Sequence, residues 1–386
     1  MFENLSILAL QQYWWVIISI LGAALVFLFF VQGGQTLLYT LAKNEDERTI
    51  LVNTFGRKWE YTFTTLVTFG GAFFASFPLF YSTSFGGAFW VWILILFAFV
   101  LQAVSYEFRS KPNNFLGKKS FEVFLFINGA LGTILTGAAV STFFTGSLFS
   151  VNQSNLTLLT GNQMPTISRW ETPFHGLEAA LNVQNLCLGL AVFFLARVLA
   201  ILYIQLNVDE EKIIQRTRKG LITNALPFLV FFLTFLTLLL LKDGFAYNAQ
   251  KQVFMEPYKY LHNLLEMPLV LILFLSGVVL VLLGIIRSYF LQSKSGIWAS
   301  GIGTFLTVFS LFLVAGFNHT SFYPSTFDLQ SSLTIENASS SKYTLVAMSY
   351  VSLFVPVVLL YIIFVWRKMN AKKLTQAEIN QESHAY

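Results

Sequence analysis

Carboxylate and guanidinium groups beside long apolar segments are the residues of this sequence best suited to chemistry. Glu60 stands directly before the uncharged run 61–81, and Glu107 and Arg109 follow the apolar run that ends near residue 106. Ionisable groups at or inside a membrane are costly, and by default they indicate function. Acids at the mouth of a packed helix bundle are suited to passing protons. Glu60 and Glu107 are therefore our candidates for a proton-entry path.

Two further charged residues allow both a structural and a functional interpretation. Glu122 opens the fourth apolar run, where it could be an ordinary rim residue that pairs or snorkels, or an acid of the same proton path. Arg197 is the basic residue well inside an apolar run. It could pair with a helix carbonyl or a carboxylate, or it could contact a partner subunit or an anionic cofactor group.

Histidine and cysteine positions argue against a cofactor bound by this chain alone. His175, His262 and His319 fall at helix ends or in links on one side, and His384 lies in the C-terminal tail. A bis-histidine haem needs imidazoles that face each other inside the bundle, so we expect no haem here. The single Cys187 excludes an internal disulfide and a cysteine-based metal cluster. We expect no metal site and no catalytic residue in this chain.

Composition identifies an integral membrane protein. The 386 residues are 55% apolar, 17% aromatic and only 11% charged, with a mean hydropathy of +0.65. In a soluble domain roughly a quarter of the residues are charged. The net charge of +5 lies in short links between apolar runs, so it reflects membrane topology and gives no reason to expect nucleic-acid binding.

The apolar runs predict an all-α bundle of about nine transmembrane helices. Each run is long enough to cross about 30 Å of hydrocarbon, which takes about 20 helical residues. A polytopic membrane domain is expected over 1–369, arranged perhaps as two four-helix bundles plus one helix, with a short polar tail over 370–386. The expected spans are 14–41, 61–82, 88–106, 121–147, 176–206, 221–241, 268–290, 297–318 and 343–366.

Positive charge is distributed unequally between the two sets of links. Most of the 24 Lys and Arg residues fall in the links 42–60, 107–120, 207–220 and 291–296 and in the tail after residue 366. Lys and Arg concentrate on the cytoplasmic side of membrane proteins. We therefore expect the N-terminus outside and the C-terminus in the cytoplasm.

Small residues in the second span predict close packing against another helix. Gly70, Gly71 and Ala75 lie in one uncharged run, and Pro78 follows them. Helices in lipid associate where small residues let their backbones approach. Gly71 and Ala75 are four residues apart and share a helix face, which we expect to contact a partner subunit, with Trp59, Arg109 and Arg197 as further structural or interface candidates.

Three groups of motifs stand out: Glu47-Arg48, Asn53, Trp59-Glu60, Gly70-Gly71-Ala72, Phe74-Ala75, Phe77-Pro78 and Tyr81; Tyr106-Glu107-Phe108-Arg109-Ser110-Lys111; and Phe322-Tyr323-Pro324-Ser325, Ser332-Leu333-Thr334 and Asn337-Ala338-Ser339-Ser340. With these motifs the chain resembles subunit II of cytochrome bd-type quinol oxidases. The resemblance extends over essentially the whole chain, because the number and order of the spans are the same.

This resemblance implies a function for the complex rather than for the chain alone. In that family subunit II is the haem-free partner of subunit I, which carries haems b and d, oxidises quinol and reduces dioxygen to water with protons from the cytoplasm. A bacterial inner membrane is implied, together with lipid, a possible structural quinone and a possible small accessory subunit. The family positions of Glu60 and Glu107 agree with their assignment as proton-path candidates.

The sequence departs from the family pattern at two places. Where the first span usually carries D-G-F-D, this chain has Gln32-Gly33-Gly34-Gln35, so both acids are replaced by amides that hydrogen-bond but carry no charge. W-D-G-N has become Trp59-Glu60-Tyr61-Thr62, which keeps a carboxylate. The chain therefore resembles a divergent branch.

Two other classes of function remain open from the sequence. A secondary transporter would have interrupted helices whose polar residues meet near the midplane, and Pro227 and Pro356 fall within spans. A purely structural membrane scaffold would differ from the oxidase subunit only in having no proton route. Turnover of the complex without Glu60 and Glu107 would favour the scaffold.

Overall fold

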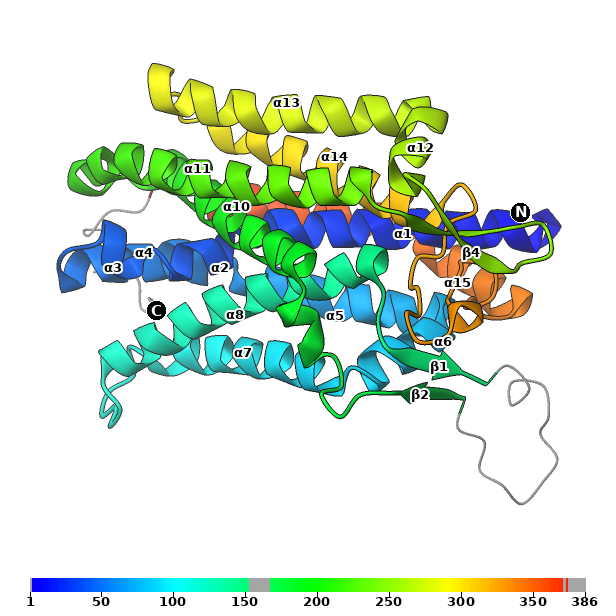
Figure 1. The fold of residues 1–386 in the computed structure, drawn as a ribbon. Helices are drawn as coiled ribbons and strands as arrows, with labels where there is room; N and C mark the ends of the chain where they lie inside the picture. Colours follow the sequence, from blue (N-terminus) through cyan, green and yellow to red (C-terminus); the bar gives the residue numbers. More distant parts are fainter. Residues whose placement is uncertain (1, 153–166, 371–372, 374–386) are drawn as a thin grey trace.

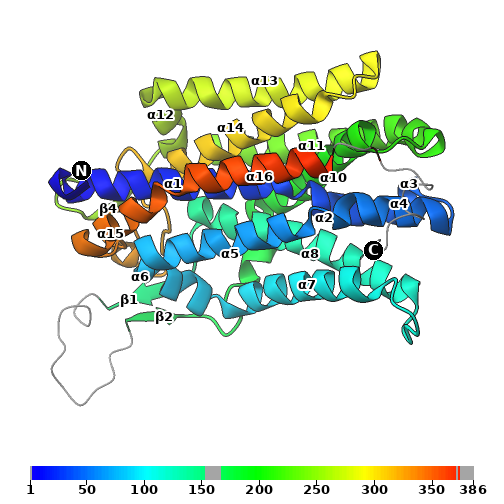
Figure 2. The same ribbon diagram turned by 180° about the vertical axis from the view of Figure 1, so that it is seen from behind.

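The computed structural model describes residues 2–152, 167–370 and 373. Long helices run side by side along one direction, with short strands gathered at one end (Figures 1 and 2). Within the described residues, eight helices are long and apolar enough to cross a membrane, and a ninth is counted when a bent pair is taken as one span. This confirms the predicted all-α bundle of about nine spans. Most of the predicted tail 370–386 lies outside the described residues.

The long helices have the following bounds: α1 Ile7–Leu28, α5 Trp59–Ser76, α7 Phe89–Phe108, α8 Lys118–Thr145, α10 Val183–Asn207, α11 Glu211–Leu241, α13 Pro268–Leu291, α14 Gly296–Gly316, α15 Lys342–Ser352 and α16 Val355–Met369. The shorter helices are α2 Phe30–Gln35, α3 Leu38–Leu41, α4 Glu45–Gly56, α6 Pro78–Phe80 and α12 Lys259–Glu266, with a π-helical turn at Tyr81–Gly86 and 3-10 turns at Phe2–Asn4, Leu177–Leu181 and Leu329–Ser331.

The two ends of the bundle differ in their content. One end holds the links 36–58, 109–117, 208–210 and 292–295, and we call it the basic end. The other, the strand end, holds two antiparallel pairs: β1 Phe149–Val151 with β2 Ser168–Trp170, and β3 Gly244–Tyr247 with β4 Val253–Glu256. The described N-terminus lies at the strand end, and α16 finishes at the basic end (Figure 2).

Helix breaks follow the local backbone chemistry. The second span breaks at Phe77, where φ is −133° and ψ 66°, because the following Pro78 has no N–H to continue the helix. The chain bends there by 117°. The last span is interrupted at Leu353 and Phe354, and Pro356 occupies the first turn of α16. Pro227, in contrast, lies inside an uninterrupted α11.

Buried aromatic rings fill the core near the strand end. Trp15 is completely buried and donates a hydrogen bond from Nε1 to the Phe312 carbonyl at 3.0 Å. Phe77 and Phe322 pack on the Trp15 ring with centroid distances of 5.8 and 4.6 Å. Buried aromatic pairs of this kind contribute more than their buried area alone. They fix α1, α5, α14 and the link after α14 relative to one another.

Close backbone approaches occur where the chain has glycine. A Cβ added to Gly33 on α2 would lie 2.0 Å from the Ala196 carbonyl oxygen on α10, and one added to Gly137 on α8 would lie 2.8 Å from the Cα of Gly189 on α10. No other residue allows these helices so near. α10 is therefore packed between α2 and α8 at the centre of the molecule.

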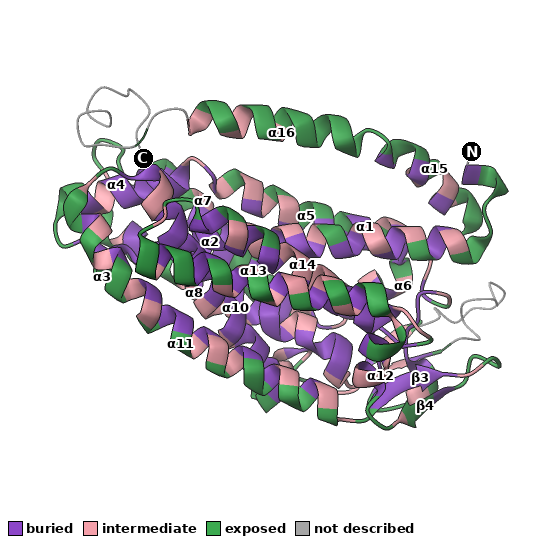
Figure 3. Cartoon of the chain, turned by 90° about the horizontal axis from the view of Figure 1, so that it is seen from above, coloured by how far each residue is buried: buried purple, intermediate pink, exposed green. Residues whose placement is uncertain are grey.

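α16 stands apart from the other helices (Figure 3). Every residue from 353 to 361 is exposed, so no face of this part of the helix packs on the described chain. Its last turn is attached: the Trp366 ring lies 5.6 Å from Tyr61 and 5.9 Å from Phe30, with the Lys58 ammonium over it at 4.9 Å. An apolar helix open on all sides must be covered by lipid or by another subunit.

Candidate functional site

A buried ion cluster forms where α4, α7 and α8 meet at the basic end. Glu122, in the first turns of α8, is completely buried. Its Oε1 accepts hydrogen bonds from Nη2 and Nε of the equally buried Arg109 at 2.7 and 3.2 Å. Its Oε2 accepts a hydrogen bond from the Tyr39 hydroxyl at 2.7 Å and lies 3.2 Å from Nε of Arg48. One carboxylate therefore holds two guanidinium groups out of water.

A second carboxylate at the surface continues this cluster. Glu45, at the start of α4, lies 3.2 Å from Arg48, 3.9 Å from Arg109 and 3.0 Å from Lys118. Its side chain is 47% exposed. The cluster as a whole pairs two carboxylates with three cations, so it connects α4, the end of α7 and the start of α8 by charge.

An amide cluster lies inside the bundle, on the membrane side of the ion cluster. Gln32 and Gln35 both donate from Nε2 to Oε1 of Gln102 at 2.6 Å. Gln32 also reaches Asn128 Oδ1 and Gln35 reaches the Tyr106 hydroxyl, each at 3.3 Å. All four amides are at most 1% exposed. They come from α2, α7 and α8, and α7 and α8 also supply Arg109 and Glu122.

Four atoms of the amide cluster have no hydrogen-bond partner: Oε1 of Gln32 and of Gln35, Nε2 of Gln102, and Nδ2 of Asn128. Buried polar atoms of proteins normally bond to protein or to ordered water. The cluster offers acceptors and donors suited to water molecules, but it holds no acid. Any proton that passes here must be carried by water, because an amide does not titrate.

The two predicted proton-entry acids lie outside both clusters. Glu107 is 60% exposed and pairs with Lys111, one turn further along the chain, at 3.1 Å. Glu60 is exposed in the first turn of α5. Among the described residues no hydrogen bond or ion pair joins either acid to Glu122. Their predicted role stays a prediction.

Trp59 links the start of α5 to the amide cluster. The half-buried ring stacks on Tyr106 at a centroid distance of 6.0 Å and an interplanar angle of 16°. Tyr106 in turn accepts the hydrogen bond from Gln35. The side chain next to Glu60 in sequence thus contacts the cluster that Glu60 itself does not reach.

The small residues of α5 occupy two different environments. Gly70 is buried, and a Cβ added there would lie 3.4 Å from the Phe85 ring. Gly71 is exposed with no atom near its Cβ position, Ala75 is half-buried, and Pro78 is exposed. The face that carries Gly71 is therefore open in the isolated chain.

Arg197 is held by neutral groups. Its Nε donates to Oδ1 of Asn224 at 2.6 Å, and its Nη1 donates to the carbonyl and hydroxyl oxygens of Thr36 at 3.3 and 3.1 Å. Of the two interpretations open from the sequence, the contact with a helix carbonyl is therefore present.

The described histidines lie at the strand end. His175 contacts the Gly87 carbonyl, His319 packs on Tyr247, and His262 lies 3.1 Å from Oε1 of Glu256. Burial by itself raises the pKa of Glu256, but hydrogen bonds from His262 and Lys259 outweigh it and lower the pKa. No group of three or more His, Cys, Asp or Glu among the described residues could hold a metal ion. His384 is outside the described residues.

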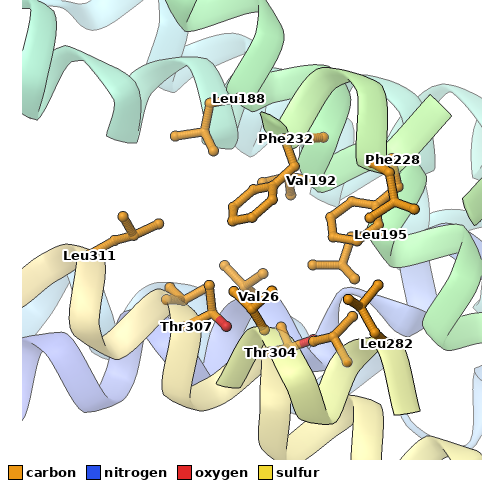
Figure 4. Close-up of a pocket in the computed structure, with 15 residues that line it drawn as sticks. Val26, Leu188, Val192, Leu195, Phe228, Phe232, Leu282, Thr304, Thr307 and Leu311 are labelled. Atoms are coloured by element: carbon orange, nitrogen blue, oxygen red, sulfur yellow. The ribbon is translucent and has the colours of Figure 1, made fainter. Parts of the chain in front are cut away.

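Two adjoining apolar cavities lie among α1, α8, α10, α11, α13 and α14, and Figure 4 shows the lining of one of them. Val26, Leu188, Val192, Val308 and Leu311 line both. Each measures about 50 Å³. An apolar cavity of about 150 Å³ is needed to hold a benzene ring. These cavities therefore fit a small apolar molecule but not a quinone ring without movement of side chains.

Sequence reasoning missed the depth of Glu122 and its contact with Arg48, and it did not identify Gln102 and Asn128. The available signal was their polarity within apolar runs, since buried amides require partners. Arg48 entered only as part of the motif Glu47-Arg48, because its charge does not stand out beside Glu45, Asp46 and Glu47.

Comparisons with known proteins give matches over nearly the whole chain. The family model described as "Cytochrome bd terminal oxidase subunit II" matches residues 10–369. The chain is 26% identical to the cytochrome bd-I ubiquinol oxidase subunit 2 of Escherichia coli (strain K12), over 97% of this chain and 98% of that protein. It is 25% identical to the cytochrome bd ubiquinol oxidase subunit 2 of Bacillus subtilis (strain 168), over 89% and 91%. In fold it is similar to a chain of the bd oxidase from Geobacillus thermodenitrificans, with a TM-score of 0.52 and 11% identity, over 92% and 98%.

Replacing Glu122 by Gln should destabilise the protein strongly. The change leaves Arg48 and Arg109 without their buried counter-charge, and breaking a buried ion pair costs about 3–5 kcal/mol. The thermal midpoint of the purified protein measures this loss. Glu107→Gln is the matched control, because an exposed i,i+4 pair contributes less than about 1 kcal/mol. Equal shifts for the two variants would contradict the assignment of the ion cluster.

Proposed function

The chain belongs to the cytochrome bd terminal oxidase subunit II family, and we propose that it is the haem-free subunit of a quinol oxidase. The match of the family model across residues 10–369 carries this proposal. In the complex, subunit I would bind haems b and d, which would take electrons from quinol and reduce dioxygen to water. This chain would support subunit I and would have no catalytic residue of its own.

We propose the bacterial inner membrane as the location, with the basic end in the cytoplasm and the N-terminus outside. The support is the charge distribution, since the links of the basic end hold most of the Lys and Arg residues. α4, α8 and α11 carry basic residues at this end, and Arg109 follows α7 there. The strand end would then face the outside with its short sheets and loops.

The contact with subunit I is proposed to lie on the open side of α5. Thr64, Thr68, Gly71 and Phe74 are exposed along this helix, and the hydroxyls of Thr64 and Thr68 bond to carbonyls within it. A face of small and internally bonded side chains suits close contact with another membrane helix. The fully exposed part of α16 is a second proposed surface for contact with subunit I.

We further propose that protons enter the complex through this chain at its basic end. Glu60 and Glu107 are exposed there and can exchange protons with water. Trp59, Tyr106 and the amide cluster lie between the start of α5 and the bundle interior. Because Gln32 and Gln35 carry no charge, a route through this cluster would depend on water. Lipid, a structural quinone and a small accessory subunit remain proposed partners.

The transporter alternative has no support among the described residues. Pro227 does not interrupt α11. The breaks at Phe77 and Leu353 are accompanied by no Asp or Glu in the adjoining turns. The scaffold alternative differs from our proposal only in the proton route.

Purification from the native membrane tests the proposed function. We expect haem absorption in the dithionite-reduced minus air-oxidised spectrum, together with a second large membrane subunit. Removal of that subunit should remove the absorption, because the haems belong to it. A colourless preparation without a partner would overturn the oxidase assignment.

Gly71→Leu should weaken the complex. The added side chain would stand on the open face of α5 where no atom of this chain opposes it, so the chain itself should still fold. Co-purification of subunit I measures the effect, and we expect a loss of severalfold or more. Val279→Phe adds bulk to an exposed position of α13, across the molecule from α7, and serves as the control (Figure 1). Unchanged co-purification of Gly71→Leu would place the interface elsewhere.

Replacing Glu60 and Glu107 together by Gln should slow quinol-dependent oxygen consumption. If these acids collect protons, their loss should reduce turnover about tenfold or more; a side chain that transfers a proton in a transition state typically contributes about 100-fold or more. Haem content and subunit composition should stay unchanged because both side chains are exposed. Glu211→Gln, at an exposed acid in the first turn of α11, is the control. Full turnover of the double variant would favour the scaffold alternative.

A further inference from the structure

We propose that Arg197 binds the phosphate of an anionic phospholipid, whose acyl chain lies along the exposed stripe of α10. This site is separate from the ion cluster and from the two apolar cavities. It rests on the charge of Arg197, on its depth in the bundle and on the residues that precede it on the same helix face.

The guanidinium of Arg197 has no counter-charge within the described part of the chain. It contacts the amide of Asn224 and two oxygens of Thr36, all neutral, and the ring of Phe193 lies 5.4 Å from Cζ. No carboxylate among the described residues forms an ion pair with it. A cation held away from bulk water is costly unless an anion accompanies it.

Two donors of Arg197 remain for a ligand. Arginine has five N–H donors in a planar fork, and the contacts with Thr36 and Asn224 use Nε and Nη1. The Nη2 group forms no hydrogen bond with the described residues, and Arg197 as a whole is only partly buried. The fork of a guanidinium matches the oxygens of a phosphate in geometry and charge.

The depth of Arg197 suits a lipid headgroup. On α11 the charged segment ends at Lys219, and Asn224, which bonds to Arg197, follows five residues later. At 1.5 Å per residue this is about 7 Å below the last charge. Arginine side chains at such a depth reach toward the interface, where lipid phosphates lie.

An apolar stripe leads from Arg197 toward the middle of the membrane. Leu186, Leu190, Phe193 and Phe194 are the partly or fully exposed residues on the face of α10 that ends at Arg197, whereas most of this helix is buried. Phe194 stacks on Phe231 of α11 at 5.9 Å and 8°, which closes one side of the stripe. In Figure 1, α10 crosses the bundle between α11 and α8.

This combination selects a phospholipid over other anions. A soluble phosphate would use the cation alone, and a protein carboxylate would not require an open apolar stripe beside it. A phospholipid places its phosphate and its acyl chain one after the other, in the same order as Arg197 and the stripe.

Lipid binding to the whole complex tests the proposal. The purified complex is reconstituted into nanodiscs of phosphatidylcholine with increasing phosphatidylglycerol, and retained phosphatidylglycerol is counted by native mass spectrometry. Arg197→Gln should weaken retention about tenfold or more, as expected for the loss of a charge-assisted hydrogen bond. Arg197→Lys, which keeps the charge, should restore part of it. Arg218→Gln, at an exposed arginine of α11 that lies over Tyr289, is the control and should retain lipid normally.

A second variant tests the binding of the acyl chain separately from that of the headgroup. Leu190→Trp keeps Arg197 and fills the stripe, so it should reduce phosphatidylglycerol retention while the complex stays assembled. This variant also tests the proposed lipid site if the complex with Arg197→Gln fails to assemble. Equal retention by wild type, Arg197→Gln and Leu190→Trp would overturn the proposal. Competition by soluble glycerol phosphate as effective as that by phosphatidylglycerol would overturn the assignment to a lipid.

Discussion

The burial of Glu122 with two arginines is the interaction on which the basic end of this protein depends. A carboxylate at zero exposure is stable only because Arg109, Arg48 and Tyr39 satisfy both of its oxygens. Taking these charges out of water is costly, so the cluster need not add net stability. We propose that it fixes the relative positions of α4, α7 and α8. The amide cluster, built on α2, α7 and α8, follows from that arrangement.

Close glycine contacts set the second constraint. Gly33 and Gly137 let α2 and α8 pack closely against α10. Arg197 lies at the end of the exposed stripe of α10 and is itself partly exposed. Inside this framework the chain has polar groups but few titratable ones. This agrees with the proposal that the chain supports a haem-bearing partner subunit.

Hydropathy and charge predicted the number of helices and the unequal ends, because both follow from sums over many residues. Which residues contact one another was harder to predict from the sequence. The predicted packing residue Gly71 lies on an open face, whereas Gly33, cited only within the motif Gln32–Gln35, makes the closest approach. Glu122 and Glu107 look alike in sequence, yet one is buried and the other pairs with Lys111 at the surface. Which acid turns inward depends on helix rotation and on an arginine from a distant helix, and neither can be read from one sequence.

A double-mutant cycle between Glu122 and Arg109 measures the central interaction most directly. The thermal midpoint of the purified complex is compared for wild type, Glu122→Gln, Arg109→Gln and the double variant. Residues that form one buried pair show coupling of about 0.5–3 kcal/mol. We therefore expect the double variant to lose clearly less stability than the sum of the two single losses. Strictly additive losses would show that the two side chains act independently, and would contradict an ion cluster that positions α4, α7 and α8.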